Sequence, residues 1–320
     1  MFPKSPSGIS AFIRLIVIFI FAFPTVSLSQ ALYSRSFGDK KAHPVIFLHG
    51  GPGGSSVFFE ATTAQLLADR GFYVIIYDRR GEGRSADGNA EMNFDEAFDD
   101  LRGIYKHYNL KKASLLAFSF GGLVAAQFAQ KHPDMVKSLT LCSALVSQQK
   151  SYDTILRAVG AIYENKKDSS NLNELASIAK MDTNSLAYRT LVFKHASANG
   201  FFNLKEPNDR AKAIYETYKT NPLITGYVKN ERAVSTFWEH EPRHNIDVTP
   251  QLEYLHQKGL PIFALYGKQD GLYSTDQISE LSNIIGDNHI KYLDNCSHTL
   301  FIDQQEAFLN AISSWVGSVR

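Results

Sequence analysis

The sequence predicts an α/β fold in which a mostly parallel sheet is flanked by helices. Two observations lead to this prediction. Short apolar runs, which indicate strands buried on both faces, alternate with longer helix-like stretches along most of the chain. Glycines, charged residues and a serine follow the ends of these runs, and in parallel sheets ligands bind at the carboxyl ends of the strands. With 320 residues, 44% of them hydrophobic, the chain can form one or two globular units with a sizeable core.

The first half of the chain contains the clearest strand signals. Apolar runs predict strands over residues 31–37, 43–48, 72–77, 113–118 and 136–141. The stretches between them predict helices over residues 58–70, 94–108 and 123–129. This alternation of strand and helix is typical of parallel sheets, because parallel neighbours need a crossover connection.

The character of the sequence changes between residues 147 and 241. Continuous apolar runs stop there, and polar helical segments rich in Lys, Asn, Tyr and Ala take their place. Beyond this stretch we expect strands over residues 261–267 and 289–293 and helices over residues 277–285 and 305–316. The predicted organisation is a core in two parts, residues 30–146 and 242–320, with a helical cap, residues 147–241, inserted after the sixth strand.

Residues 1–29 are predicted to be a secretory signal peptide. Lys4 and Arg14 are the only charges in this stretch, and the apolar run from Leu15 to Phe23 is nine residues long. Ser27 and Ser29 provide a small-x-small cleavage site. A spanning helix needs about 20 apolar residues, so no stable membrane span is expected once the signal is removed. The sequence therefore predicts an exported protein, periplasmic or secreted, with an uncleaved N-terminal anchor as the alternative.

Composition excludes several classes of function. The formal net charge is +1, and no basic block suggests a nucleic-acid partner. The two cysteines, Cys142 and Cys296, are far apart in sequence and have no metal-ligand spacing. We expect both to be small buried residues that do not pair. No metal and no organic cofactor is implied.

The segment from Ala117 to Gly122 has the pattern of a nucleophile elbow. An apolar strand leads into Ser119 and a helix-like run leads out of it. The residues two before and two after the serine must be small because the turn is tight, and they are Ala117 and Gly121. The start of a helix also favours negative charge. Ser119 is therefore a candidate nucleophile.

A serine needs a base within hydrogen-bond reach and an acid that orients this base. Asp270 follows the strand expected over 261–267, and His298 follows the last expected strand. The order Ser, Asp, His along the chain is the order found with nucleophile elbows. Asp276, Asp287 and Asp294 are weaker candidates for the acid, because none directly follows the 261–267 strand.

Acyl transfer also requires donors for the oxyanion. The backbone N–H of Phe120, the residue after the serine, is one candidate. The glycine-rich loop after the 43–48 strand supplies the other, and Gly51 is the best choice because Pro52 has no N–H. A phosphate-binding loop is the alternative interpretation, but no Gly-Lys-Ser/Thr follows.

Two motifs resemble those of proline iminopeptidases, a branch of the α/β-hydrolases. His49-Gly50-Gly51-Pro52-Gly53-Gly54 is similar to the oxyanion motif of this family. The segment from Asp78 to Ser85, Asp-Arg-Arg-Gly-Glu-Gly-Arg-Ser, is similar to its Asp-Gln-Arg-Gly-x-Gly-x-Ser stretch. The resemblance covers about residues 43–146 and 245–320 and implies an α/β-hydrolase fold. Departures are Ala117 for the first elbow glycine, Phe120 where tryptophan is frequent, Arg79 for glutamine, and the exported start.

The resemblance also implies where specificity lies. Family members hold the substrate's free amino group with acidic cap residues, beside a pocket for the proline ring. Phe237-Trp238-Glu239 resembles the family's Trp-Glu cap segment, so Glu239 is the candidate partner of an ammonium group, with Glu241 and Glu231 as rivals. Trp238 would line the pocket or pack in the cap, and Glu239 could also be an exposed helix residue.

Three functions follow from these features. The first is an exported aminopeptidase that releases N-terminal proline or small residues from short peptides. The second is a carboxylesterase or lactonase that uses the same residues on small acyl substrates. The third, more remote, is a non-catalytic ligand-binding module. A serine at the elbow argues against the epoxide-hydrolase and dehalogenase chemistries, which need a carboxylate nucleophile.

Overall fold

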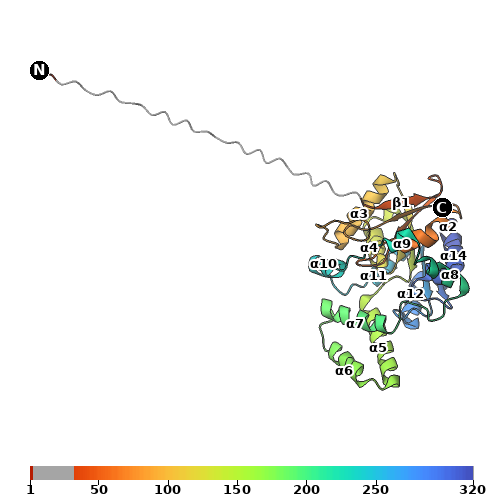
Figure 1. Cartoon of the computed structure of the whole chain (residues 1–320). Coiled ribbons are helices and arrows are strands. Elements are labelled where there is room, and N and C mark those ends of the chain that lie inside the picture. Colours follow the sequence, from red (N-terminus) through yellow and green to blue (C-terminus); the bar gives the residue numbers. More distant parts are fainter. Residues whose placement is uncertain (3–31, 320) are drawn as a thin grey trace. The chain divides into compact units, whose positions relative to one another are not determined.

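The computed structural model describes residues 1–2 and 32–319 (Figure 1). The predicted signal peptide falls almost wholly outside these residues. Contacts group the chain from residue 31 onwards into one compact unit. In the part of the chain that is described, no helix combines the length and the apolar character needed to cross a membrane.

The centre of this unit is a seven-stranded sheet in the order β1-β3-β2-β4-β5-β6-β7. Its strands are β1 (Ser34–Phe37), β2 (His43–Leu48), β3 (Phe72–Tyr77), β4 (Ala113–Phe118), β5 (Val136–Cys142), β6 (Ile262–Gly267) and β7 (Ile290–Leu293). Only β1 is antiparallel to its neighbour, and the other pairs are parallel. The predicted sheet is therefore confirmed, and the strand ends lie within a few residues of the expected positions.

Helices cover both faces of the sheet. They are α1 (Val57–Phe59), η1 (Glu60–Ala64, a π-helical turn), α2 (Gln65–Ala68), α3 (Phe94–His107), α4 (Gly121–Lys131), η2 (Pro133–Met135), α11 (Thr249–Gln257), α12 (Thr275–Ile285), η3 (Asp287–His289), α13 (Leu300–Asp303) and α14 (Gln305–Ser318). The helix predicted over 58–70 is thus present but divided into three pieces. Helix α11 has no counterpart in the sequence-based prediction.

The core consists of two apolar clusters, one on each face of the sheet, because successive side chains of a strand point to opposite faces. On β2, Ile46 and Leu48 face one cluster, whereas Val45 and Phe47 face the other. All four side chains are at most 1% exposed. Successive side chains of a strand point to opposite faces, so the continuous apolar runs arise because helices bury both faces of the sheet. Cys142 and Cys296 are buried and unpaired, as expected, and burial raises the pKa of both thiols.

The helical segment between β5 and β6 contains α5 (Gln148–Lys166), α6 (Ser169–Ile178), α7 (Leu186–Ala198), α8 (Asp209–Thr217), α9 (Pro222–Thr225) and α10 (Ala233–His240). Helix α5 packs against α6 and α7, and the three are grouped together in Figure 1. The expectation that this segment follows a sixth strand is wrong, because it follows β5, the fifth. The reason is the short N-terminal part of the sheet, in which a single strand, β1, precedes β2 among the described residues.

Candidate active site

The three candidate catalytic residues follow three strands that end at the same edge of the sheet. Ser119 follows β4, Asp270 follows β6, and His298 lies in the loop after β7. The strands β4, β5, β6 and β7 are consecutive neighbours and run parallel. Because these strands are parallel, the loops that follow them lie at the same edge of the sheet. The three residues therefore come together although they are up to 179 positions apart in sequence.

The turn at Ser119 is as tight as the small residues around it predict. Ser119 has a φ of 52°, in the left-handed region that side chains seldom adopt. A Cβ atom on Gly121 would lie 2.5 Å from the carbonyl oxygen of Leu48, so only glycine fits there. Ala117 lies opposite Leu48 in the parallel ladder and is fully buried, so its single methyl is accommodated. The close packing of this turn on the end of β2 holds the serine at the tip.

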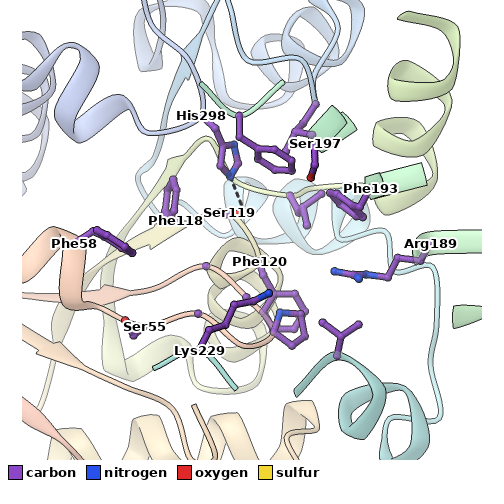
Figure 2. A pocket seen from close by; sticks show the side chains of 18 of the residues that line it. Ser55, Phe58, Phe118, Ser119, Phe120, Arg189, Phe193, Ser197, Lys229 and His298 are labelled. Atoms are coloured by element: carbon purple, nitrogen blue, oxygen red, sulfur yellow. Dashed lines mark hydrogen bonds between the residues drawn. The ribbon is translucent and has the colours of Figure 1, made fainter. Parts of the chain in front are cut away.

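Ser119, His298 and Asp270 form a hydrogen-bonded chain. The Nε2 atom of His298 lies 3.0 Å from the hydroxyl oxygen of Ser119 (Figure 2). Its Nδ1 atom lies 2.8 Å from the carboxylate of Asp270. Asp270 and His298 are 3% and 7% exposed. An imidazole with Nδ1–H donating to the carboxylate presents Nε2 as an acceptor to the serine. This arrangement can take the proton of an attacking serine.

The rival aspartates lie elsewhere. Asp294 is exposed and pairs with Lys268 at 2.8 Å. Asp276 lies in the first turn of α12, and Asp287 accepts a hydrogen bond from the hydroxyl of Ser282. Asp270 is therefore the acid that contacts His298.

A second buried acid, Asp303, holds the loop that carries His298. Its Oδ2 atom accepts hydrogen bonds from the backbone N–H and the hydroxyl of Ser297, at 2.8 and 2.5 Å. Its Oδ1 atom accepts from the hydroxyl of Tyr215 on α8, at 2.8 Å. Asp303 thus fixes the residue next to the histidine and joins it to the helical segment. Our sequence interpretation missed this residue.

The loop after β2 is held by His49 and Arg79. The carbonyl oxygen of Gly50 lies 2.8 Å from the guanidinium of Arg79 and 2.6 Å from Nδ1 of His49. Arg79 also donates to the carbonyl of His49 at 2.7 Å. In a trans peptide the N–H points away from the C=O, so anchoring the Gly50 carbonyl turns the N–H of Gly51 to the opposite side.

Two backbone donors remain available beside the serine. Among the described residues, the N–H groups of Gly51 and Phe120 donate no hydrogen bond within the protein. Both residues line the pocket at Ser119, and Phe120 immediately precedes α4, whose first residue is Gly121. Free N–H groups at this position can stabilise an oxyanion.

Side chains of the segment 78–85 stabilise the glycine-rich loop after β2. Asp78 accepts hydrogen bonds from the backbone and the hydroxyl of Ser56, at 2.7 and 2.6 Å, and from the guanidinium of Arg84, at 2.7 Å. The guanidinium of Arg84 also donates to the carboxylate of Glu60, at 2.5 Å. The motif singled out in the sequence therefore ties the glycine-rich loop to the helical segment that follows it.

A pocket of about 420 Å³ opens in front of Ser119. Its apolar lining comes mainly from aromatic side chains, namely Phe58, Phe118, Phe120, Phe193 and Phe202. The basic side chains of Arg189 and Lys229 also line it. Among the described residues no aspartate or glutamate lines this pocket.

Neither Glu239 nor Trp238, the predicted substrate-binding residues, lines the pocket, and their positions match the alternatives of an exposed helix residue and a residue packed in the cap. Glu239 is exposed, and it lies about 140° around α10 from Val234, the helix residue that lines the pocket. Trp238 packs in the cap, where its indole N–H donates to the carbonyl of Asn184 at 3.0 Å and its ring stacks on His244.

The rivals of Glu239 are also engaged outside the pocket. Glu241 is buried and accepts from the backbone N–H of Phe94 at 3.0 Å, and it pairs with Arg243 at 2.8 Å. Glu231 is exposed and pairs with Lys229 at 3.1 Å. The sequence motif correctly identified a helix beside the pocket but not the direction of its carboxylates.

Comparison with known proteins identifies the family. The model of the alpha/beta hydrolase fold family matches residues 43–305. This chain belongs to the α/β-hydrolase fold family. Over 302 residues the hydrolase is 25% identical to the proline iminopeptidase of Clostridioides difficile, and the match covers 89% of this chain and 94% of that protein. A segment of 132 residues is 31% identical to the proline iminopeptidase of Arabidopsis thaliana, covering 40% of this chain but only 33% of the plant protein. The hydrolase is therefore proline iminopeptidase-like in sequence.

Solved structures agree on the fold. A proline iminopeptidase-related protein of Thermus thermophilus superposes with a TM-score of 0.65, at 24% identity, and the match covers 90% of this chain and 94% of that one. A structure from work on carboxylesterases of Nitrososphaera gargenis superposes with a TM-score of 0.61, at 19% identity, over 92% and 97% of the two chains. A protein related to proline iminopeptidases and a protein from work on carboxylesterases thus both share the fold of this chain.

The burial of His49 predicts how the stability of the hydrolase depends on pH. Burial, reinforced by the guanidinium of Arg79, lowers the pKa of His49 to about 3. An unfolded histidine titrates near 6.5. Between these values the unfolded chain binds a proton that the native chain does not, so the free energy of unfolding falls as the pH drops. The slope from this one group is up to about 1.4 kcal/mol per pH unit.

Urea unfolding at pH 7.5, 6.0 and 5.0 measures this effect. A His49→Asn variant is the control, because its amide can still donate to the Gly50 carbonyl but does not titrate. We expect a flatter pH dependence for the variant, with the remaining slope due to other groups such as His43, whose pKa is lowered to about 4. Equal slopes in the two proteins would contradict the prediction.

Proposed function

We propose that this α/β-hydrolase is a serine hydrolase that cleaves small carboxylic esters through an acyl-enzyme. The observation that carries the proposal is the hydrogen-bonded chain of Ser119, His298 and Asp270, whose serine and histidine line a largely aromatic pocket. The free N–H groups of Gly51 and Phe120 beside the serine support it, since acyl transfer needs donors at this place.

In the proposed reaction the Ser119 oxygen attacks the ester carbonyl while His298 takes the serine proton on Nε2. Asp270 stabilises the imidazolium through Nδ1. The tetrahedral oxyanion accepts hydrogen bonds from the N–H groups of Gly51 and Phe120. When the intermediate collapses, the alkoxide leaves with the proton from His298, and the acyl group remains on Ser119.

Water completes the cycle. His298 removes a proton from a water molecule that attacks the acyl-enzyme, and a second tetrahedral intermediate forms at the same oxyanion site. Its collapse releases the carboxylic acid and returns the proton to Ser119.

The pocket lining favours esters over N-terminal peptides. An aminopeptidase must bind the free ammonium group of its substrate, and an ammonium buried without a counter-charge is costly. Among the described residues, no carboxylate lines this pocket. The second candidate, release of N-terminal proline or small residues, is supported by the names of the relatives that match most of the chain.

A substrate panel separates the two candidates. We expect turnover of p-nitrophenyl acetate and butyrate and little turnover of prolyl and alanyl p-nitroanilides. The panel is repeated with Glu239→Gln, which should change neither rate if Glu239 is an exposed helix residue. Prolyl anilide turnover that collapses in Glu239→Gln would instead support the aminopeptidase and overturn the ester proposal.

Arg79 is expected to support the oxyanion site rather than the substrate. Replacing it with methionine removes the donors that anchor the Gly50 carbonyl, so kcat on a neutral aryl ester should fall about 10- to 100-fold with a smaller change in KM. Arg79→Gln keeps one donor group and should recover part of the loss. Steady-state kinetics with thermal unfolding as a check on folding measures this. A methionine variant with unchanged kcat would contradict the role.

Export through residues 1–29 is a separate proposal, supported by the charge and apolar pattern of that stretch. N-terminal sequencing of material secreted by an expressing cell tests it. A mature terminus near residue 30 would support cleavage after Ser29. An intact terminus in the membrane fraction would support the anchored alternative.

A further inference from the structure

We propose that the pocket selects acyl substrates that carry a carboxylate remote from the ester, and that Arg189 binds this carboxylate. The inference rests on the proposed hydrolase function and adds the class of substrate. Figure 2 shows the guanidinium of Arg189 directed into the pocket, on the side away from His298. Arg189 comes from α7, a helix of the segment between β5 and β6.

Arg189 lacks the acidic partner that enclosed arginines normally have. Among the described residues, the arginines without a carboxylate within 4.0 Å are Arg157, Arg189 and Arg232. Arg157 and Arg232 are exposed to solvent, where water satisfies the charge. Arg189 is partly buried and lines the pocket. A guanidinium stays protonated under all ordinary conditions, so the pocket contains an uncompensated positive charge.

Aromatic rings hold the guanidinium in place without neutralising it. Its central carbon lies 4.7 Å from the ring centre of Phe193 and 5.6 Å from that of Trp238. Such contacts are weak compared with the cost of removing a cation from water. Burial accordingly lowers the pKa of Arg189. A carboxylate on the substrate would remove this cost and accept two parallel hydrogen bonds from the planar group.

The remaining charges around the pocket favour an anion as well. Lys229 lines the same pocket, and although it pairs with Glu231 at 3.1 Å, both side chains are more than half exposed. Exposed pairs of this kind are screened by solvent, so Lys229 can attract an anion at the entrance. The nearby acids are engaged, since Asp270 contacts His298 and Glu82 contacts Arg79 at 2.7 Å. The charge pattern thus opposes a substrate ammonium and favours a substrate carboxylate.

The test compares matched anionic and neutral esters. The anionic probes are mono-p-nitrophenyl esters of adipate and suberate, and the neutral probes are the p-nitrophenyl esters of the alkanoic acids of equal length. A second pair, 4-carboxyphenyl acetate and phenyl acetate, places the carboxylate on the leaving group. We expect at least one anionic probe to exceed its neutral partner about tenfold or more in kcat/KM, with the preference weakened by 0.5 M salt.

Variants assign the preference to Arg189. Arg189→Gln should remove the preference, and Arg189→Lys should retain part of it because the charge remains while the planar fork is lost. Arg157→Gln is the matched control, since it removes one exposed arginine from α5, outside the pocket, and should leave the ratio unchanged. If Arg189→Gln does not fold by circular dichroism, the wild-type preference together with Arg189→Lys decides.

The outcomes separate this inference from the proposed function. Turnover of neutral esters with no preference for any anionic probe would overturn the inference and leave the hydrolase proposal standing. A preference that persists in Arg189→Gln would also overturn it. Absence of turnover on every ester, with no labelling of Ser119 by a fluorophosphonate, would instead refute the proposed function itself.

Discussion

Replacing Ser119 with alanine is expected to lower kcat on short-chain aryl esters by about 10⁴-fold or more. The hydroxyl oxygen lies 3.0 Å from Nε2 of His298 and is the nucleophile of the proposed acyl-enzyme. Removal of a triad nucleophile leaves only the catalysis that the oxyanion donors and binding supply. The loss should appear in kcat with little change in KM, because the methyl side chain still fits the tight turn.

Covalent labelling gives a second measurement of the same role. A fluorophosphonate probe should modify the wild-type protein at Ser119 with one equivalent and should leave Ser119→Ala unmodified. Ser170→Ala is the control, since Ser170 is an exposed residue of α6, outside the pocket. Ester turnover that survives in Ser119→Ala would remove Ser119 as the nucleophile. If no ester is turned over and Ser119 is not labelled, the non-catalytic binding module becomes the better explanation.

Replacing Asp270 with asparagine is expected to lower kcat by about 10³- to 10⁴-fold. The substitution preserves size but replaces the carboxylate that accepts from Nδ1 of His298 at 2.8 Å. The asparagine amide can donate to Nδ1, which favours the tautomer with the proton on Nε2, and this tautomer cannot accept the serine proton. The imidazolium formed during attack also loses its counter-charge.

Asp294→Asn provides the matched control for Asp270. Asp294 follows the neighbouring strand β7, but it is exposed and pairs with Lys268. We therefore expect wild-type turnover from this variant. Kinetics over a range of pH should show partial recovery of Asp270→Asn at high pH, where hydroxide can replace the missing base. Equal rates for Asp270→Asn and the wild type would show that another acid orients His298.

Much of the sheet, and the meeting of Ser119, Asp270 and His298, could be predicted because local patterns encode them. The strands β2, β3 and β4 start and end where their apolar runs do, since burial on both faces demands continuous apolar sequence. Ser119 was identified from the small residues on either side, and the space around Gly121 explains that requirement. Asp270 and His298 were identified by their positions after strands, and parallel pairing places such positions at one edge.

The cap was predicted only as a helical region, because the direction of a side chain depends on how its helix packs. Glu239 was chosen from a local motif, yet α10 places Phe237 in the core and leaves Glu239 exposed. Arg189 lies in α7, a helix whose sequence has no pronounced apolar face. The sequence around Arg189 has no feature that distinguishes it from the sequence around Arg157, the exposed arginine of α5.

The sequence by itself therefore determined the α/β architecture, and it predicted the candidate nucleophile, base and acid, which the structure brings into contact, and the glycine-rich loop beside them. These features depend on residues near one another in the chain or on the fixed geometry of parallel strands. Only the tertiary structure decided which charges line the pocket and what holds the catalytic loops. The anchors at Arg79 and Asp303, and the basic pocket at Arg189, depend on contacts between segments that are distant in the chain. Such contacts leave no local pattern, because packing alone brings the partners together.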